Sequence, residues 1–338
     1  MGSLVAAQEV RRSTVGSELI VDAHLDIAYN ALAECRPFDG APAAGYLLSR
    51  ESLVEAGVGL VFPTIFAHPR RKTFSVVTPA WSYRTAGEAH LIGLAQLNYY
   101  RSVGLEVLGT AAAVRSYRES WKPGRLAGVL LMESADPIES PGQLPAWFEQ
   151  GLRVIGPAWA RTRYSGGTGA PGGLTTPGRE LLGRMEELGM VLDLAHMADR
   201  AWQESLELYR GPVVATHGGS RALAPGQRQF SDEMVKAVGE RGGIVGVSFF
   251  AGHLRPASAA TLADVAKHIR HFATVAGGPE RVGLGTDLDG GFNATEAPLR
   301  KLREIGRLAP LLQRHFSRSQ VDGIMGDNWL DLLERVLP

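Results

Sequence analysis

The alternation of short apolar runs with longer helical segments is the feature that most constrains this fold. Runs rich in Val, Ile and Leu recur along the chain, and such runs are typical of buried strands. Longer segments with a helical period separate them. The runs span Leu19–His24, Val58–Phe66, Ala127–Glu133, Leu152–Ala158, Val191–His196, Pro212–His217, Gly243–Phe249 and Arg281–Asp287. We therefore expect eight strands.

The intervening segments carry the start and stop signals of helices. Ser231 precedes Asp232 and Glu233 as an N-cap would, and Gly242 and Gly277 fall where helices should end. Regular alternation of strand and helix predicts an α/β protein with a parallel sheet, and eight strands close a (β/α)8 TIM barrel. The predicted helices are Ala86–Arg101, Gly178–Leu188, Asp199–Tyr209, Ser231–Arg241 and Thr261–Ala276.

The length of 338 residues fits one such barrel, which needs about 250, with long loops added. We expect residues 1–18 to be an N-terminal extension and residues 19–338 to be one barrel domain, ending in a helix near Ser319–Val336. Ser102–Arg125 should hold extra turns, and the glycines and prolines of Gly166–Gly178 predict a loop. An open, doubly wound sheet is the alternative, but Gly283–Gly290, the glycine-rich stretch, comes at the last strand instead of an early one.

Charge and cysteine content exclude several classes of function. Lysine plus arginine (35) equals aspartate plus glutamate (35), so no excess charge points to nucleic acid or an anionic membrane. The single cysteine, Cys35, excludes an intrachain disulfide and a thiolate metal cluster. No apolar run reaches the roughly 18 residues of a membrane helix, and Met1–Glu18 lacks a signal-like run. We expect a cytoplasmic protein.

Polar residues that suit a metal end five of the eight runs. His24 and Asp26 end the first, Glu133 the third, His196 the fifth, His217 the sixth and Asp287 the eighth. In a barrel these ends meet at one rim, where active sites of this fold lie. Singly, each has a structural explanation, such as a helix cap or a turn. Jointly they predict metal binding, because buried imidazoles and carboxylates are costly unless paired or metal-bound.

Six such residues exceed the needs of one catalytic zinc, which takes three protein ligands and keeps an open position. Two metals that share a carboxylate fit the number better. A bridging water at such a site becomes a hydroxide near neutral pH and can attack an acyl or phosphoryl centre.

The chain resembles the membrane (renal) dipeptidase family of zinc peptidases, within the amidohydrolase-like barrels. The segments that carry the resemblance follow one another in family order over almost the whole chain beyond residue 20. They are Asp22–Asp26, Leu131–Glu133, Asp193–His196, Thr216–Arg221, Arg228–Asp232, Gly242–Phe250, Gly283–Gly290 and Gly326–Leu330. The resemblance implies a dipeptidase with two Zn²⁺ ions and a small peptide as substrate. It also favours a homodimer.

Residue roles follow from the same resemblance. It implies that His24 and Asp26 hold one zinc, that His196 and His217 hold the other, and that Glu133 bridges the two ions. Asp287 would act as the acid/base. Arg228 would bind the terminal carboxylate of the substrate as a bidentate pair.

Trp159 is the one serious departure from the family pattern. Family dipeptidases have a histidine here, just past the fourth strand, which is thought to contact the substrate carbonyl. An indole donates one hydrogen bond but carries neither a proton nor a charge. Arg161, Arg163 or Tyr164 could replace the lost electrophile. Two alternatives to a dipeptidase therefore stay open: the same metal site acting on another amide, ester or lactone, and a metal-bearing binding protein with little activity.

Overall fold

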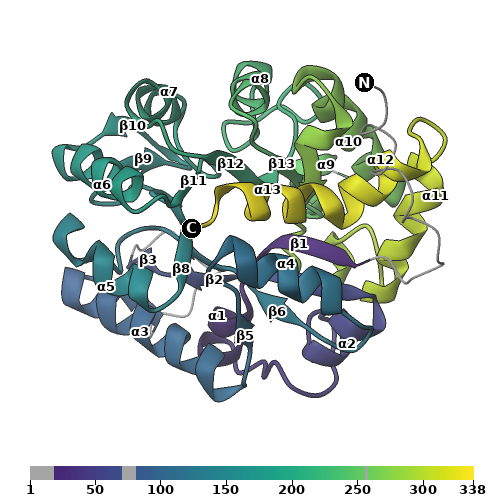
Figure 1. Ribbon diagram of the computed structural model, residues 1–338, viewed down its shortest axis with the longest axis horizontal. Helices are drawn as coiled ribbons and strands as arrows, with labels where there is room; N and C mark the ends of the chain where they lie inside the picture. Colours follow the sequence, from purple (N-terminus) through teal and green to yellow (C-terminus); the bar gives the residue numbers. More distant parts are fainter. Residues whose placement is uncertain (1–18, 71–80, 256–257) are drawn as a thin grey trace, which may run out of the picture.

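The computed structural model describes residues 19–70, 81–255 and 258–338, and its centre is a parallel sheet (Figure 1). Residues 1–18, expected to form an extension, lie outside the described residues. Each of the eight predicted runs contains a strand of this sheet. These strands are β1 Ile20–Leu25, β2 Val58–Phe66, β7 Leu130–Glu133, β8 Leu152–Gly156, β11 Val191–Asp193, β12 Val213–Gly218, β13 Val245–Val247 and β14 Val282–Leu284.

The eight strands pair in chain order, from β1 through β2, β7, β8, β11, β12 and β13 to β14, and every pairing is parallel. Side-chain and backbone contacts join the first strand to the last. The Asp287 N–H donates to the His24 carbonyl oxygen at 3.2 Å. The Thr286 N–H donates to Asp22 Oδ1 at 2.8 Å. The predicted (β/α)8 barrel is confirmed.

Helices surround the sheet close to the predicted positions. The Ser231 side chain accepts the Met234 N–H, as expected of an N-cap, and Thr261 and Asp264 form a reciprocal capping box. The predicted helices are α3 Ala86–Ser102, α6 Thr176–Glu187, α7 Asp199–Leu208, α8 Asp232–Glu240 and α10 Leu262–Val275. Within Ser102–Arg125, where extra turns are expected, the structure has a short strand, β5 Glu106–Val107, and a helix, α4 Ala111–Ser120.

The C-terminal helix covers the side of the barrel that faces the viewer in Figure 1. It runs as α12 (Arg318–Asp322), a π-helical turn η6 (Gly323–Asp327) and α13 (Asn328–Val336). A Cβ at Gly326 would lie 2.2 Å from the Leu19 carbonyl oxygen, so only glycine permits this close approach to the start of β1. Trp329 is fully buried and its Nε1 donates to the Leu284 carbonyl oxygen at 3.0 Å.

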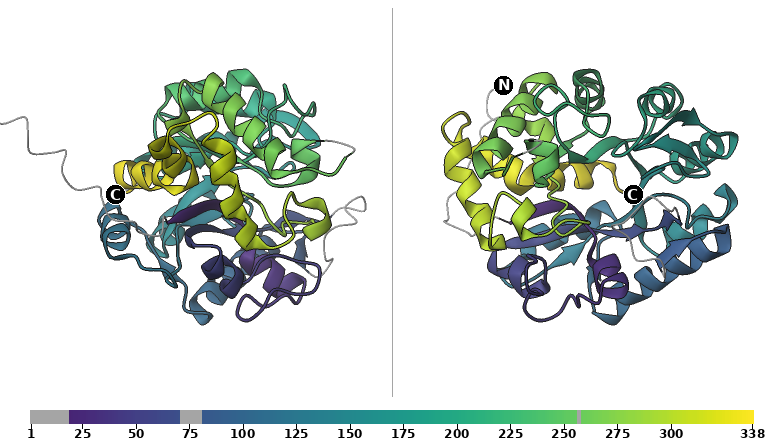
Figure 2. Two further views of the ribbon diagram at one scale, coloured as in Figure 1. Left: turned by 90° about the vertical axis from the view of Figure 1, so that its right-hand side faces the viewer. Right: turned by 180° about the vertical axis from the view of Figure 1, so that it is seen from behind.

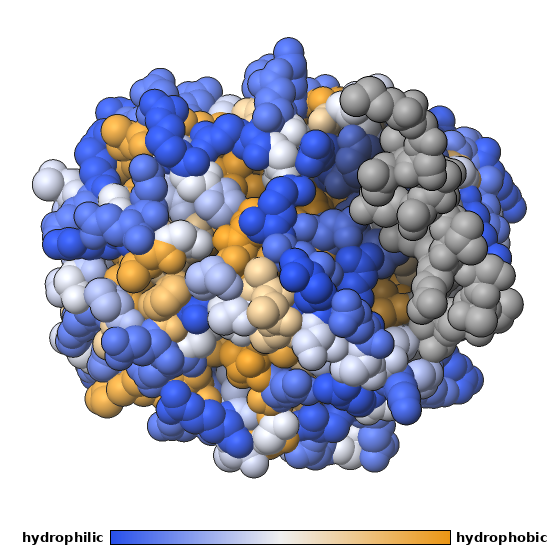
Figure 3. Space-filling model, viewed as in Figure 1, coloured by the Kyte–Doolittle hydropathy of each residue, from blue (hydrophilic) through white to orange (hydrophobic). Residues whose placement is uncertain are grey.

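The surface on this side mixes many hydrophilic residues with scattered hydrophobic ones (Figure 3). Figure 2 shows the helices around the barrel from two further directions. Among the described residues, none of the helices is both long enough and apolar enough to span a membrane. The remaining elements are β3 His68–Pro69, β4 Ser82–Tyr83, β6 Ala127–Gly128, α1 Ile27–Ala33, α2 Arg50–Glu55, η2 Pro141–Gln143, α5 Leu144–Glu149, α9 Ala251–Leu254, η3 Pro279–Arg281, η4 Ala294–Glu296, η5 Leu302–Arg307 and α11 Leu308–Leu312.

The prediction of a plain loop over Gly166–Gly178 is wrong. This stretch contains most of an antiparallel hairpin, β9 (Ser165–Gly167) with β10 (Ala170–Leu174), and the start of α6. The glycines of this stretch let its backbone pack closely against neighbouring segments, and they do not make it an open loop. A Cβ at Gly167 would lie 2.4 Å from the Ala160 carbonyl oxygen. The hairpin is therefore fixed against the segment that follows β8.

Candidate metal centre

One carboxylate oxygen lies among three imidazoles where strands of the barrel end. Glu133, the last residue of β7, places its Oε1 3.6 Å from Nε2 of His24 and 3.5 Å from Nε2 of His217. His196, just beyond β11, places its Nε2 3.1 Å from the same oxygen. The rim of the barrel thus brings together four residues that are far apart in the sequence.

A second group of possible ligand atoms adjoins the first. Atoms of His24, Asp26 and Asp287 lie within 4.8 Å of one another, as do atoms of His24, Glu133 and His217. His24 Nε2 and Glu133 Oε1 are buried and lack a hydrogen-bond partner among the described residues. Buried polar atoms are normally satisfied. Their convergence, together with the imidazole and carboxylate chemistry of the set, fits a divalent metal of the zinc type.

Threonines support the ligands from behind. Thr216 Oγ1 lies 3.2 Å from His217 Nδ1 and 3.4 Å from His24 Nδ1, and it donates to Asp193 Oδ2. Thr168 Oγ1 lies 3.0 Å from His196 Nδ1. Thr64 donates to Asp26 Oδ1. Hydrogen bonds of this kind fix the ring orientation of a metal-binding histidine.

Backbone strain also concentrates at the centre. His196 has φ 65° and Asp287 has φ 60°, and Ser134, directly after Glu133, has φ 68°. Residues other than glycine seldom adopt this left-handed conformation, and such residues cluster at functional sites. The barrel therefore holds two of the six polar residues at the strand ends in conformations that cost free energy.

The charges of the centre shift the pKa values of its members in opposite directions. Burial would raise the pKa of Glu133, but the neighbouring His24 and His196 imidazoles hold it well below its usual range. Burial would lower the pKa of His24, but attraction to Glu133 raises it to about 10. Burial and the Arg228 charge lower the pKa of His196 to about 4, and burial lowers that of His217 well below its usual value. Both shifts favour the neutral rings that bind a metal, whereas a metal would have to displace the proton that Glu133 favours on His24.

The carboxyl groups on the other side of the centre bind protons more readily. Burial, assisted by the Glu133 charge, raises the pKa of Asp26 to about 6. Burial raises the pKa of Asp287 well above its usual range, against attraction to His24 and with repulsion from Asp26. A carboxyl group that can hold a proton suits an acid/base.

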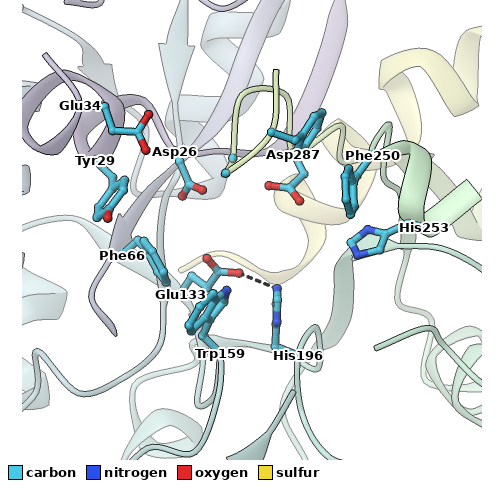
Figure 4. A pocket seen from close by; sticks show the side chains of 13 residues that line it. Asp26, Tyr29, Glu34, Phe66, Glu133, Trp159, His196, Phe250, His253 and Asp287 are labelled. Atoms are coloured by element: carbon cyan, nitrogen blue, oxygen red, sulfur yellow. Dashed lines mark ion pairs between the residues drawn. The ribbon is translucent and has the colours of Figure 1, made fainter. Parts of the chain in front are cut away.

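A cavity of about 280 Å³ opens onto these groups (Figure 4). Asp26, Glu133, His196 and Asp287 all contribute to its lining. The residues around them are Tyr29, Glu34, Phe66, Trp159, Phe250, His253, Gly290, Gly291 and Phe292.

A second cavity, of about 160 Å³, shares the Trp159, His196 and His253 side chains with the first. Arg228 lines it, together with Ala160 and Thr168. Arg228 Nη2 donates to the His217 carbonyl oxygen at 3.1 Å, while Nε and Nη1 are buried without a hydrogen-bond partner among the described residues. Burial lowers the pKa of Arg228. Two unpaired donors of a buried guanidinium are suited to an anionic ligand.

Trp159 occupies the wall between the two cavities. Its ring lies 5.3 Å from that of Phe66 and 6.1 Å from that of His196. The residues suggested as substitutes for the missing histidine are engaged elsewhere. Arg163 pairs with Asp136 at 3.3 Å, Tyr164 donates to the Ile138 carbonyl oxygen and Arg161 donates to the Pro171 carbonyl oxygen. None of the three lines either cavity, so that suggestion is not supported.

Several lining residues were missed by sequence analysis. His253, for which the sequence pattern predicts no role, lines both cavities, and its Nδ1 lies 3.1 Å from Ser248 Oγ. Phe250 follows the seventh run directly, and Phe292 follows the eighth by a few residues. That proximity to strand ends is the one signal that could have found these two phenylalanines. Asp289, in the turn after β14, accepts the Leu47 and Leu48 N–H groups and so joins this turn to a distant segment of the chain.

Comparison with known families bears on the whole chain. Residues 8–337 match the model of the membrane dipeptidase family (peptidase family M19). The chain belongs to this family. Members of the M19 family are metal-dependent peptidases, so this M19 chain is a hydrolytic metallopeptidase, and the predicted resemblance is confirmed.

Individual relatives of this M19 chain are moderately similar. A protein encoded in the PQQ-III 3′ region of Acinetobacter calcoaceticus is 38% identical over 39% of this chain and 45% of its own length. A protein encoded in the pqqA 5′ region of Klebsiella pneumoniae is 30% identical over 72% of this chain and 93% of its own length. The chain thus covers less than half of the Acinetobacter protein.

A solved structure supports the fold. The metallopeptidase from Rhodobacter sphaeroides, liganded with a phosphinate mimic of the dipeptide L-Ala-D-Ala, superposes with a TM-score of 0.81. It is 24% identical, and the match covers 94% of this chain and 99% of that one.

Proposed function

We propose that this M19 chain is a dipeptidase that works with two zinc ions. His24 and Asp26 would hold one ion, His196 and His217 the other, and Glu133 would serve both. The observation that carries this proposal is the position of Glu133 Oε1, which lies between 3.1 and 3.6 Å from the Nε2 atoms of three histidines. A carboxylate at such a position can be shared by two metals.

The residues around the ions would divide the chemistry. When bound, two zinc ions supply Lewis acidity, which polarises a scissile carbonyl and acidifies water to hydroxide. Asp287 would take the proton of the attacking water on its carboxylate and return it to the leaving amine. Its position in the lining of the larger cavity, beside Asp26 and Glu133, supports this role.

Arg228 would orient the substrate. Its Nε and Nη1 are buried without a hydrogen-bond partner among the described residues, and these free donors of a positive charge suit a carboxylate. A free α-carboxylate bound in the smaller cavity would leave the preceding amide near Glu133 and Asp287. The two cavities, of about 280 and 160 Å³, suit a ligand of dipeptide size. The phosphinate dipeptide mimic bound by the Rhodobacter relative also supports a dipeptide substrate.

The test is a panel of dipeptides with L- or D-residues at the C-terminal position, assayed with the zinc-loaded protein. Metal content is measured by plasma mass spectrometry on the same samples. We expect about two metal ions per chain and hydrolysis of dipeptides that is lost when a chelator removes them. Dipeptide amides, which keep the free amine and lack the free carboxylate, are the matched control. Equal hydrolysis of these amides would contradict the role of Arg228.

Trp159 supports a second candidate, in which the same centre cleaves another amide, an ester or a lactone. The indole between the two cavities changes the pocket at the position where family dipeptidases carry a histidine. Esters and lactones added to the panel decide between the candidates by their relative kcat/KM. Two bound metals with no turnover of any compound would instead favour a metal-bearing binding protein.

A further inference from the structure

Two groups of aromatic side chains stand on opposite sides of the larger cavity. Tyr29 and Phe66 lie together on one side, with ring centroids 5.1 Å apart. Phe250 and Phe292 pair on the other side, with centroids 4.9 Å apart. In Figure 4 the catalytic carboxylates lie between the side that holds Tyr29 and Phe66 and the side that holds Phe250. Trp159 extends the first group, 5.3 Å from Phe66.

The lining of this cavity is far more aromatic than the chain as a whole. Five of its thirteen residues are Phe, Tyr or Trp, whereas these types make up 7% of the sequence. A cavity wall of this kind is the usual environment for an apolar or aromatic ligand group. None of the five side chains is among the predicted metal ligands, so metal binding does not explain their presence.

The aromatic walls are firmly held. Tyr29, Phe66 and Phe292 are 4%, 5% and 5% exposed, so most of each ring is packed against protein and only an edge or a face meets the cavity. Rings fixed in this way lose little conformational entropy when a ligand binds. They also come from separate parts of the fold: α1, the end of β2 and the loop after β14. The space between them therefore has a set width.

The two cavities can be assigned to the two residues of a dipeptide. Arg228 lines the smaller cavity, which also contains the small Ala160 and Thr168. If Arg228 binds the α-carboxylate, as the proposed function requires, the C-terminal residue occupies this smaller space. The residue on the acyl side of the scissile bond must then point into the larger, aromatic cavity.

We infer that the preferred substrates are dipeptides whose N-terminal residue carries an aromatic or bulky apolar side chain, held between the Tyr29–Phe66 and Phe250–Phe292 walls. This inference rests on the proposed function and specifies its substrate class. Stacked or edge-to-face contacts between aromatic rings add to the gain from burying their area. A phenyl side chain also buries more apolar area against these rings than a methyl group does.

The experiment compares Phe-Ala with Ala-Ala, both with the C-terminal stereochemistry that the enzyme accepts. A hydrophobic pocket typically discriminates between substrates that differ by one methylene by roughly 10–200-fold. We therefore expect kcat/KM to be about 10–100-fold higher for Phe-Ala than for Ala-Ala. In Phe292→Ala the Phe-Ala to Ala-Ala ratio should fall about tenfold, because one wall loses a ring. Phe250→Leu provides a second, milder variant in case the first does not fold.

Phe316→Ala is the matched control, since Phe316 lines a separate surface cavity with Arg270 and His315 and should leave the ratio unchanged. Equal kcat/KM for Phe-Ala and Ala-Ala overturns the inference and leaves the proposed function intact. If neither Phe-Ala nor Ala-Ala is hydrolysed, the proposed function is overturned. In that case calorimetric titration of both dipeptides into the metal-loaded protein decides the inference, and equal affinities overturn it.

Discussion

The strand-end wall and the loop wall of the cavity are built in different ways. The strand-end wall comprises Asp26, Glu133, His196 and Asp287, which line the cavity, and the predicted metal ligands His24 and His217, which are buried beside them. These polar side chains are held by threonine hydroxyls and by the barrel itself. The loop wall comprises the lining residues that follow strands β8, β13 and β14: Trp159, next to Phe66, and Phe250, His253 and Phe292, on the opposite side.

The residues of the loop wall lie on the connections that follow β8, β13 and β14. They are held mostly by packing between aromatic rings. The difference predicts that chemistry and substrate choice are separable in this molecule. Changes in the strand-end wall should affect every substrate equally. Changes in the loop wall should alter the ranking of substrates.

Glu133→Gln should give the largest effect on the strand-end wall. The substitution keeps the size of the side chain but removes the charge that three imidazoles surround. Both ions would lose a ligand, and we expect kcat/KM to fall by more than about 10⁴-fold with all substrates. Plasma mass spectrometry should find fewer metal ions per chain. Full metal content with normal activity would show that the strand-end wall does not hold the metals.

Asp287→Asn tests the division of roles within the same wall. Loss of a general acid/base typically costs about 10²–10⁴-fold in rate, and we expect a loss of this size with metal content unchanged. The measurement is kcat on the best dipeptide, together with metal analysis.

Asp289→Asn, two residues further along, is the matched control for Asp287→Asn. Asp289 accepts the Leu47 and Leu48 N–H groups and faces Arg36 Nη1 at 3.7 Å. Its replacement should lower Tm and change kcat little. If Asp287→Asn keeps full activity, the assigned acid/base role is wrong.

Thr216→Val should have a smaller effect, because it removes support and no ligand. Its hydroxyl donates to Asp193 Oδ2 and lies 3.2 Å from His217 Nδ1. Loss of such a partner typically costs 10–100-fold in metal affinity. Competition with a chelator measures that affinity. Thr274→Val, whose hydroxyl donates to the Arg270 carbonyl oxygen on an exposed surface, should bind metal like the unchanged protein. An unaltered affinity in Thr216→Val would mean that the barrel alone fixes the histidine rings.

The residues of the strand-end wall are easier to predict from the sequence than those of the loop wall, for a geometric reason. Parallel strands of a barrel all end at one rim, so a polar residue at the end of a run, such as Glu133 or His217, has a predictable position. Loops have no such constraint. The side chain of His253 reaches the cavity from α9, and the ring of Phe292 comes from the turn after Asp289. No period in the sequence indicates where these loops fold back. For the same reason the β9–β10 hairpin was predicted as a plain loop.

Trp159→His should give the smallest change, and it should be a gain. An imidazole can carry a positive charge while it donates a hydrogen bond to a developing oxyanion, whereas an indole donates only as a neutral group. A single oxyanion donor is worth about 10²–10³-fold. The histidine would, however, lose ring contact with Phe66, 5.3 Å away, and would enlarge the cavity. We therefore expect kcat/KM for dipeptides to rise only about tenfold.

Trp159→Phe is the matched control for this gain, because it keeps an aromatic ring at the wall and removes the N–H donor. It should leave dipeptide turnover unchanged or lower it. Both variants are assayed on dipeptides and on the esters of the panel. A gain in Trp159→His that is confined to dipeptides would show that the loop wall selects the substrate. An equal gain with all substrates would place Trp159 in the chemistry, and the separation between the two walls would then be wrong at this residue.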